Sequence, residues 1–317
     1  MLFLLLIAGL VMLYAGAELL VKGAVDLAQR FGIGPLVIGL TVVAFGTSAP
    51  ELTVSIQAAL AGTGDIAAAN VVGSNIFNLA VILGLSALIF PIRITAQVVR
   101  VDMPVMIVVS VAGAIVLSDK ALSRVEGLFL CLGIIGYMAL SFYLARQKTS
   151  ESFARQIEDR LEKSPSSPTR PVWRSAVMVI FGLILLVLGS KALVEGAVRL
   201  ARLWGLSEAI IGLTIVSVGT SMPELATSVV AAMRRQADIA VGNIVGSNIF
   251  NILLILGASS VIRPYTAVGL TGVDIGVMCV LAALTLPFMW SRFTLSRFEG
   301  LILLVGYALY LAYRWPT

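Results

Sequence analysis

The sequence contains no histidine and only two cysteines in 317 residues. Without imidazole, the zinc, copper and iron sites built on it are disfavoured, and so is a histidine proton shuttle. Cys131 and Cys279 lie in separate apolar stretches without CxxC spacing, as small packing residues do. Charge is also scarce, at 12% of residues, where soluble domains have about 25%. The remainder is rich in apolar residues, with a mean hydropathy of +1.02, and this predicts a helical membrane protein with several spans.

Apolar runs of about 20 residues recur along the chain, and each is long enough to cross a bilayer as a helix. We expect ten spans, at about 2–29, 34–61, 66–91, 101–118, 124–145, 173–201, 207–233, 238–261, 269–288 and 295–314. The apolar N-terminus lacks a small-residue cleavage site, so it is predicted to be the first span and not a signal peptide. The basic residues lie mainly in loops, where they determine topology, so no nucleic-acid partner is expected.

An internal repeat divides the chain into halves at an offset of 173 residues. Residues 31–55 and 204–228 agree at 13 of 25 positions, and NVVGSNIFN at 70–78 recurs as NIVGSNIFN at 243–251. We predict a first repeat at 1–145, a polar cytoplasmic linker at 146–172 and a second repeat at 173–317, with the most similar blocks at about 34–91 and 207–261.

An odd number of spans in each half requires the second half to enter the membrane from the opposite side. The predicted fold is therefore an all-α integral membrane protein with ten transmembrane helices, arranged as two inverted five-helix repeats, as in many secondary transporters. Fourteen lysines and arginines lie on the linker side of the membrane and six on the other. The positive-inside rule then predicts a multi-pass protein of the cell (inner) membrane with both termini outside.

Two carboxylates occupy equivalent places in the halves, in GTSAPEL at 46–52 and GTSMPEL at 219–225. A charged carboxylate near the bilayer centre costs at least about 2.5–3.5 kcal/mol, so Glu51 and Glu224 indicate a function that needs both. Pro50 and Pro223 each remove a helical N–H and would break the helix. Broken helices at membrane depth line cavities, and their free carbonyls coordinate cations.

The polar side chains around these glutamates offer oxygen only. Hydroxyls come from six residues and amide oxygens from two, namely Thr47, Ser48, Ser74, Thr220, Ser221, Ser247, Asn78 and Asn251. Carboxylate, amide and hydroxyl oxygens suit hard cations such as Ca²⁺ or Na⁺. Two glutamates neutralise one Ca²⁺ or hold two or more monovalent ions, so the same oxygens can serve either load, which is a chemical basis for exchange.

Structural explanations remain open for several of these features. A buried glutamate can be protonated and bonded to a neighbouring carbonyl, and the two GSN tripeptides can be close-packing motifs. Two opposite-charge pairs at (i, i+4), Glu18/Lys22 and Lys191/Glu195, are predicted to be ion pairs that ease burial of both partners.

GTSAPEL…NVVGSNIFN and GTSMPEL…NIVGSNIFN resemble the two alpha-repeats of the cation/calcium exchanger superfamily, over essentially the whole chain. The resemblance implies Ca²⁺ bound by the Glu51 and Glu224 side chains and the Thr47 and Thr220 carbonyls. It also implies Na⁺ sites that use these glutamates together with further oxygens, from the side chains of Ser48, Ser74, Ser221, Ser247 and Asn78 and the carbonyls of Ala44 and Ser217. Sodium/calcium exchangers carry Asp where this chain has Asn251, which leaves Na⁺ or H⁺ as the coupling ion.

The expected function is therefore exchange of Ca²⁺ for Na⁺ by alternating access, with membrane lipid as the surroundings and one chain sufficient for transport. A Ca²⁺/H⁺ antiporter on the same fold is the alternative, and a passive cation channel is a remote one. We expect no cofactor and no enzymatic activity. An intramembrane hydrolase is disfavoured by the absence of histidine, and no hydroxyl–base pair fits a nucleophile better than a ligand shell.

Overall fold

The computed structural model describes residues 2–160, 171–204 and 217–314, and most of them are helical. The first half contains α1 (Leu2–Phe31), α2 (Pro35–Ile38), the π-helical segment η1 (Gly39–Val43), α3 (Ala44–Thr47), α4 (Ala49–Ala61), α5 (Gly64–Phe77), η2 (Asn78–Ile82, π-helical), α6 (Leu83–Ile89), η3 (Val98–Asp102, π-helical), α7 (Met103–Val116) and α8 (Arg124–Arg160). The second half contains α9 (Val172–Leu203), α11 (Ser217–Thr220), α12 (Met222–Met233), α13 (Ala237–Phe250), η5 (Asn251–Leu256, π-helical), α14 (Gly257–Ile262), α15 (Gly272–Trp290), the 3₁₀ turn η6 (Ser291–Phe293) and α16 (Arg297–Arg314).

The helices agree with the predicted spans wherever these are described. Seven are long and apolar enough to cross a membrane, and the bent segment from α2 to α4 makes an eighth. The span predicted at 207–233 lies partly outside the described residues, and its described part is α11 and α12. The last predicted span is α16. α8 continues beyond the predicted span to Arg160, so the first part of the predicted polar linker is helical.

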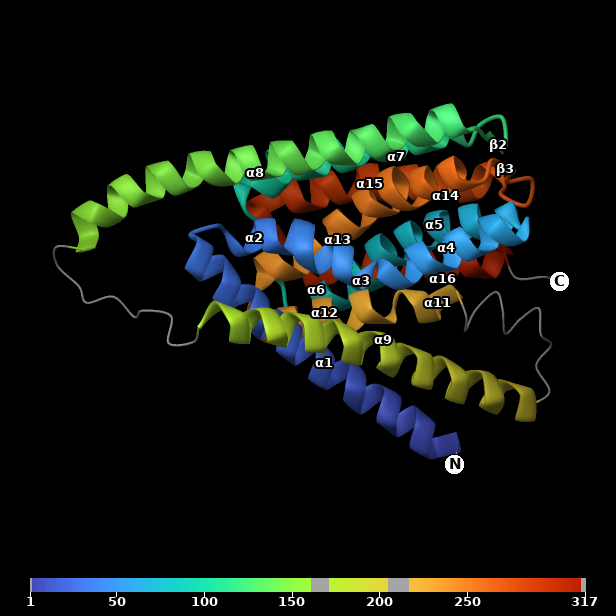
Figure 1. Cartoon of the computed structure of the whole chain (residues 1–317), viewed down its shortest axis with the longest axis horizontal. Coiled ribbons are helices and arrows are strands. Elements are labelled where there is room, and N and C mark those ends of the chain that lie inside the picture. The colour runs from blue at the N-terminus through green and yellow to red at the C-terminus, as the bar shows by residue number, and fades with distance from the viewer. Residues whose placement is uncertain (1, 161–170, 205–216, 315–317) are drawn as a thin grey trace.

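α1 and α9 lie side by side along one flank of the bundle (Figure 1). Glycine recurs every seventh residue on both helices, at positions 9, 16 and 23 and again at 182, 189 and 196. A Cβ added to Gly16 would lie 2.8 Å from the carbonyl oxygen of Gly182, and one added to Gly182 would lie 2.8 Å from that of Gly16. The two backbones are therefore in direct contact, with no room for a side chain between them.

The centre of the bundle is formed by the spans that carry the repeated motifs. Of an 18-residue apolar stretch within each span, 72% is buried in Gly64–Ile89 and 94% in Ala237–Ile262, against 33% in α1 and 28% in α9. α13 of the second half packs against α2, η1 and α3 of the first, and α5 packs against α4 and against η5 of the second half. The halves are thus interlocked where their sequences are most alike.

Each GTS-x-PE motif interrupts its span at the serine. Ser48 separates α3 from α4, Ser221 separates α11 from α12, and the first span bends by 44° at this break. The prediction that proline makes the break is wrong in position, because Pro50 and Pro223 lie in the first turn of the following helix, where a missing N–H is tolerated. The carbonyl of Gly219, four residues before Pro223, accepts a hydrogen bond from the Ser190 hydroxyl on α9 at 2.5 Å.

Two short antiparallel strand pairs join the halves outside the helices. β1 (Ile92–Arg93) pairs with β4 (Thr294–Leu295), and β2 (Ala121–Leu122) pairs with β3 (Tyr265–Thr266). These strands were not predicted, since two residues carry no periodicity that a sequence pattern can reveal.

Candidate cation site

The two motifs meet at the centre of the fold, and each glutamate is held by the serine of the other half. The Ser48 hydroxyl donates to Oε1 of Glu224, and the Ser221 hydroxyl donates to Oε1 of Glu51, both at 2.9 Å. Both glutamates are only 1% exposed. The equivalence seen in the sequence is therefore a direct, reciprocal contact between the halves.

The second oxygen of each carboxyl group lacks a partner. Oε2 of Glu51 and Oε2 of Glu224 are both buried without a hydrogen bond. Within the described residues, neither glutamate takes part in an ion pair. A buried carboxylate without a compensating charge costs several kcal/mol, so the pair requires protons or bound cations.

Asn78 and Asn251 add amide oxygens at equivalent places. The Asn251 side chain donates to Oδ1 of Asn75 at 2.9 Å and leaves its own Oδ1 unpartnered, whereas both polar atoms of Asn78 are unpartnered. Each of the two residues begins a π-helical segment, η2 or η5. Such segments are frequent at functional sites, and here they provide a structural signal that sequence reasoning did not use.

The predicted hydroxyl groups surround the glutamates. Ser74 lies 3.2 Å from the Ser221 hydroxyl, and Ser247 lies beside Glu224. The Thr47 hydroxyl donates to Asn243 at 3.0 Å, and the Thr220 hydroxyl contacts the equivalent asparagine, Asn70, at 3.3 Å.

The sequence also predicts the backbone carbonyls of Ala44 and Ser217 as Na⁺ ligands. The Ala44 carbonyl already accepts hydrogen bonds from the Ser48 amide at 3.0 Å and from the Thr47 hydroxyl at 3.3 Å, so a cation there would share it or displace a donor. Ser217 begins α11, and its side chain lies outside the described residues.

Asn70 and Asn243 are the residues that sequence reasoning missed. The Asn70 side chain donates to the backbone carbonyl of Glu51 at 3.2 Å, and that of Asn243 donates to the carbonyl of Glu224 at 3.3 Å. Each amide oxygen accepts from the threonine of the opposite half. Both asparagines are the first residues of the repeated nine-residue blocks, so the repeat itself contained the signal.

One of the two predicted ion pairs on the outer helices is present. Lys22 lies 2.8 Å from Glu18, as predicted. The predicted Lys191–Glu195 pair is wrong, since Glu195 pairs instead with Arg199, one turn further along α9. Glu18 also accepts from Nε of Arg234 at 2.9 Å, a contact that connects α1 to the residue following α12.

The arrangement is chemically suited to a cation that binds reversibly. Two carboxylates, two amide groups and several hydroxyls offer oxygen ligands, and the described residues contain no cluster of three or more His, Cys, Asp or Glu side chains. Few charges among many neutral oxygens favour hard cations.

Comparison with known proteins identifies the family. The model of the family described as sodium/calcium exchanger protein matches residues 1–143 and 174–315. The chain belongs to the sodium/calcium exchanger family. The match falls in two blocks that correspond to the two repeats, and membership in this family supports cation antiport as the activity.

Relatives match along nearly their whole length. The putative antiporter CaxA of Alkalimonas amylolytica is 39% identical, with 95% of this chain and 94% of CaxA covered. The inner membrane protein YrbG of Escherichia coli is 37% identical, covering 97% and 95%. The sodium/calcium exchanger MaX1 of Methanosarcina acetivorans is 33% identical, covering 98% and 97%.

Among solved structures, the sodium-calcium exchanger NCX_Mj soaked with 10 mM Na⁺ and 10 mM Sr²⁺ has a TM-score of 0.83 to this chain at 29% identity. The alignment covers 97% of this chain and 96% of NCX_Mj. The likeness confirms the predicted fold class, a helical membrane protein built from two inverted repeats.

Proposed function

We propose that this chain exchanges Ca²⁺ for Na⁺ across the membrane by alternating access, with the two cations competing for Glu51 and Glu224. The observation that carries the proposal is the pair of buried carboxyl groups, one from each half, each with one oxygen unpartnered. One Ca²⁺ or two Na⁺ neutralise the pair, and an empty charged site is too costly to carry across an apolar barrier. Binding of one cation therefore requires release of the other.

The proposed Ca²⁺ ligands are the Glu51 and Glu224 side chains with the Thr47 and Thr220 carbonyls. The proposed Na⁺ ligands are the glutamates, Ser48, Ser74, Ser221, Ser247, Asn78 and the Ala44 and Ser217 carbonyls, with the Asn251 oxygen available beside them. The unpartnered oxygens of Asn78 and Asn251 support this assignment, since buried polar atoms are otherwise almost always paired.

The proposed location is the cell membrane, with both termini outside and residues 146–172 on the cytoplasmic side. The excess of basic residues on the linker side supports this orientation. The name of the relative YrbG, an inner membrane protein, supports the location. One chain contains both halves of the site, so a monomer suffices for transport.

Exchange of Ca²⁺ for H⁺ is the second candidate, and Asn251 is the residue that favours it. Its side chain is an amide, which donates to Asn75, and it therefore adds no third negative charge to the site. A site with two carboxyl groups can carry two protons in place of Na⁺ in exchange for one Ca²⁺, because burial favours the neutral form of a carboxyl group.

The decisive experiment is radioactive Ca²⁺ uptake into proteoliposomes of the purified protein. Vesicles are loaded with Na⁺ at matched pH, or are held inside-acid without Na⁺, or contain neither gradient. Uptake that requires Na⁺ supports the proposal, and uptake driven only by the pH gradient establishes the proton-coupled alternative. Uptake without any counter-gradient identifies a channel.

The substitutions Glu51→Gln and Glu224→Gln test the shared site. Each preserves the shape of the side chain and removes one of the two negative charges, so each should abolish Ca²⁺ uptake while the protein elutes as a folded species in size-exclusion chromatography. Normal Ca²⁺ uptake by either folded variant would refute competition at a shared carboxylate pair.

A further inference from the structure

The GSN tripeptides of the two repeated blocks do not share one role in packing. A Cβ added to Gly246 would lie 2.7 Å from the carbonyl oxygen of Leu40, so the second tripeptide lets two spans approach closely. A Cβ added to Gly73 would meet nothing within 4 Å. Close packing therefore explains the second tripeptide and not the first, whose asparagine, Asn75, is completely buried. The role of Asn75 has to come from its polar contacts.

The side chain of Asn75 connects acceptor groups on one side to a donor on the other. Its Nδ2 donates to the backbone carbonyl of Asn248 at 3.3 Å and lies 3.9 Å from the sulfur of Met278. A carbonyl and a thioether can only accept hydrogen bonds, so Nδ2 of Asn75 faces them and its Oδ1 faces the other way. That oxygen accepts from Nδ2 of Asn251 at 2.9 Å.

These contacts also fix the orientation of the Asn251 amide. A half-turn of that amide would place its oxygen against the oxygen of Asn75, where neither atom can donate. With Nδ2 of Asn251 held at Asn75, Oδ1 of Asn251 is directed away from Asn75, and it is buried without a hydrogen-bond partner. The oxygen, and not the nitrogen, is therefore the atom that Asn251 offers to a cation.

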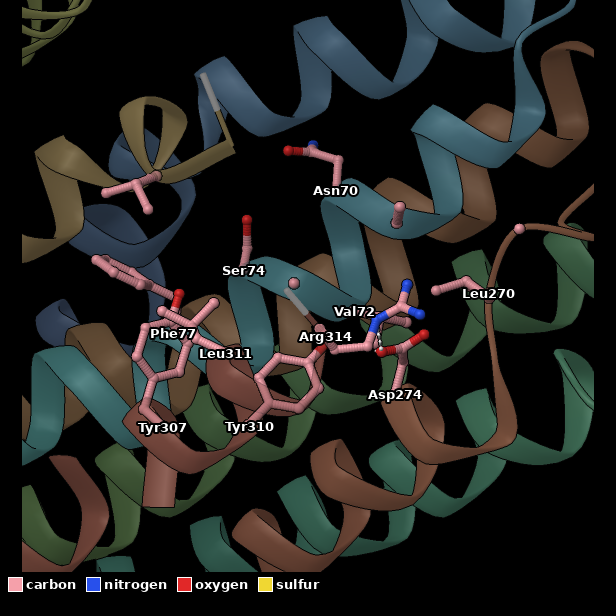
Figure 2. Close-up of a pocket in the computed structure, with 14 residues that line it drawn as sticks. Asn70, Val72, Ser74, Phe77, Leu270, Asp274, Tyr307, Tyr310, Leu311 and Arg314 are labelled. Atoms are coloured by element: carbon pink, nitrogen blue, oxygen red, sulfur yellow. Dashed lines mark hydrogen bonds and ion pairs between the residues drawn. The ribbon is translucent and has the colours of Figure 1, made fainter. Parts of the chain in front are cut away.

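Water cannot replace Asn75 in this arrangement. A cavity of about 230 Å³ lies between α5, α11, α15 and α16, and Asn70 and Ser74 line it from α5 (Figure 2). Asn75 follows Ser74 in the chain, but it does not line the cavity, and neither Asn75 nor Asn251 is more than 1% exposed. Without Asn75 the groups that it contacts would stay buried and unpartnered, which is costly.

The other pair of equivalent asparagines is arranged differently. Asn248 corresponds to Asn75 at the offset of 173, but its side chain donates to the carbonyl of Ile244 in its own helix at 2.7 Å. Asn78 corresponds to Asn251, and both polar atoms of its side chain lack a partner. The protein therefore fixes the orientation of the Asn251 amide and leaves that of Asn78 to the bound ion.

We propose that Asn75 is a positioning residue, which presents the oxygen of Asn251 to Na⁺ and keeps the N–H₂ group of Asn251 away from the ion. The inference rests on the proposed function, because it takes the site as one that binds Na⁺ beside Asn251. Without Asn75, the Asn251 amide can turn its hydrogens toward the ion, and Na⁺ then loses one oxygen ligand. The expected effect is about a tenfold rise in the half-saturating Na⁺ concentration, which corresponds to about 1.4 kcal/mol. The proposed Ca²⁺ ligands do not include this oxygen, so Ca²⁺ binding should change little.

The test measures binding as the rise in melting temperature of the purified protein in detergent with increasing NaCl or CaCl₂, with choline chloride holding the ionic strength constant. In Asn75→Leu the half-saturating Na⁺ concentration should rise about tenfold, and the Ca²⁺ value should stay within about twofold of the wild type. Asn251→Leu should raise the Na⁺ value to the same extent. The double variant should not exceed Asn251→Leu, because Asn75 acts only through Asn251.

Met278→Leu is the matched control. It changes a buried neighbour of Asn75 at nearly constant volume and keeps the carbonyl of Asn248 in place, so both half-saturating values should stay at the wild-type level. If Asn75→Leu does not elute as a folded species, Asn75→Ser takes its place. The serine hydroxyl is too short to reach Asn251, so the same Na⁺ shift is expected.

An unchanged Na⁺ value in the folded Asn75 variant would overturn the inference. Equal weakening of Na⁺ and Ca²⁺ binding would also overturn it, since that indicates general damage to the site, and so would a double variant that binds Na⁺ more weakly than Asn251→Leu. If the Na⁺ shift is found but Ca²⁺ uptake by the wild type does not require Na⁺, the inference holds and the proposed function fails. A wild type that Na⁺ does not stabilise refutes both.

Discussion

Replacing Asn243 by alanine should destabilise the protein more than replacing Asn70, although the two side chains make equivalent hydrogen bonds. Asn243 donates to the Glu224 carbonyl and to the Ser228 hydroxyl, at 3.3 and 2.9 Å. Asn70 donates to the Glu51 carbonyl and the Ser55 hydroxyl, at 3.2 and 2.9 Å. The difference lies in their surroundings, because Asn243 is completely buried and Asn70 lines the cavity.

The expected magnitudes follow from that difference. A buried polar group left without a partner costs about 1–3 kcal/mol. In Asn243→Ala the Glu224 carbonyl and the Ser228 hydroxyl both lose their donor, so the two together cost about 2–6 kcal/mol. In Asn70→Ala, water from the cavity can reach the Glu51 carbonyl and the Ser55 hydroxyl, which lose their donor. A water-mediated bond is nearly as favourable as the direct one, so the loss should be about 1 kcal/mol.

Thermal unfolding of the purified variants in detergent checks this, with Asn70→Ala as the matched control for Asn243→Ala. The melting temperature of Asn243→Ala should be clearly below that of Asn70→Ala, and both should be below the wild type. Equal melting temperatures for the two variants, or a lower one for Asn70→Ala, would show that water does not reach Asn70 and would refute the reasoning.

Two further predictions concern the outer helices. Gly16→Ala places a Cβ 2.8 Å from the carbonyl oxygen of Gly182 and should cost about 1–3 kcal/mol of stability in the same melting assay. Gly306→Ala is the control and should be neutral, because a Cβ there meets nothing within 4 Å. Equal effects of the two substitutions would contradict direct backbone contact between α1 and α9. Glu18→Gln and Arg234→Gln should each lower stability by up to about 1 kcal/mol, a small loss because half of the Arg234 side chain is exposed. The double variant should lose no more than either single variant, because both substitutions break the same ion pair. Additive losses would show that the two residues do not interact.

Much of the architecture could be predicted because duplication leaves a strong pattern. The offset between the two GTS-x-PE motifs, together with an odd number of spans in each half, requires inverted repeats without reference to any contact. The same equivalence picked out Glu51 and Glu224, since buried carboxylates are rare and these two recur at the same place. In the structure both glutamates lie among the hydroxyl and amide groups that the sequence predicts as ligands.

What the sequence could not provide is the identity of each partner. No pattern indicates that Ser48 reaches the glutamate of the other half and not its own, because that depends on how α12 and α4 are placed beside each other. The spacing of four residues predicts an ion pair of Glu195 with Lys191, but Arg199 lies at the same spacing on the other side of Glu195 and forms the pair instead. Asn70 and Asn243 were not predicted, because in the sequence an asparagine that donates to a backbone carbonyl cannot be told from any other polar residue in a span.

The two small strand pairs have a consequence for the origin of the chain. The offset of 173 converts β1 into β3 and β4 into β2, so the contact between β1 and β4 and the contact between β2 and β3 are the same contact made twice. A single five-helix half thus contains both strands that the contact requires. Two separate copies of one ancestral half, inserted in opposite directions, would satisfy both pairings, and fusion of their genes would add only the linker.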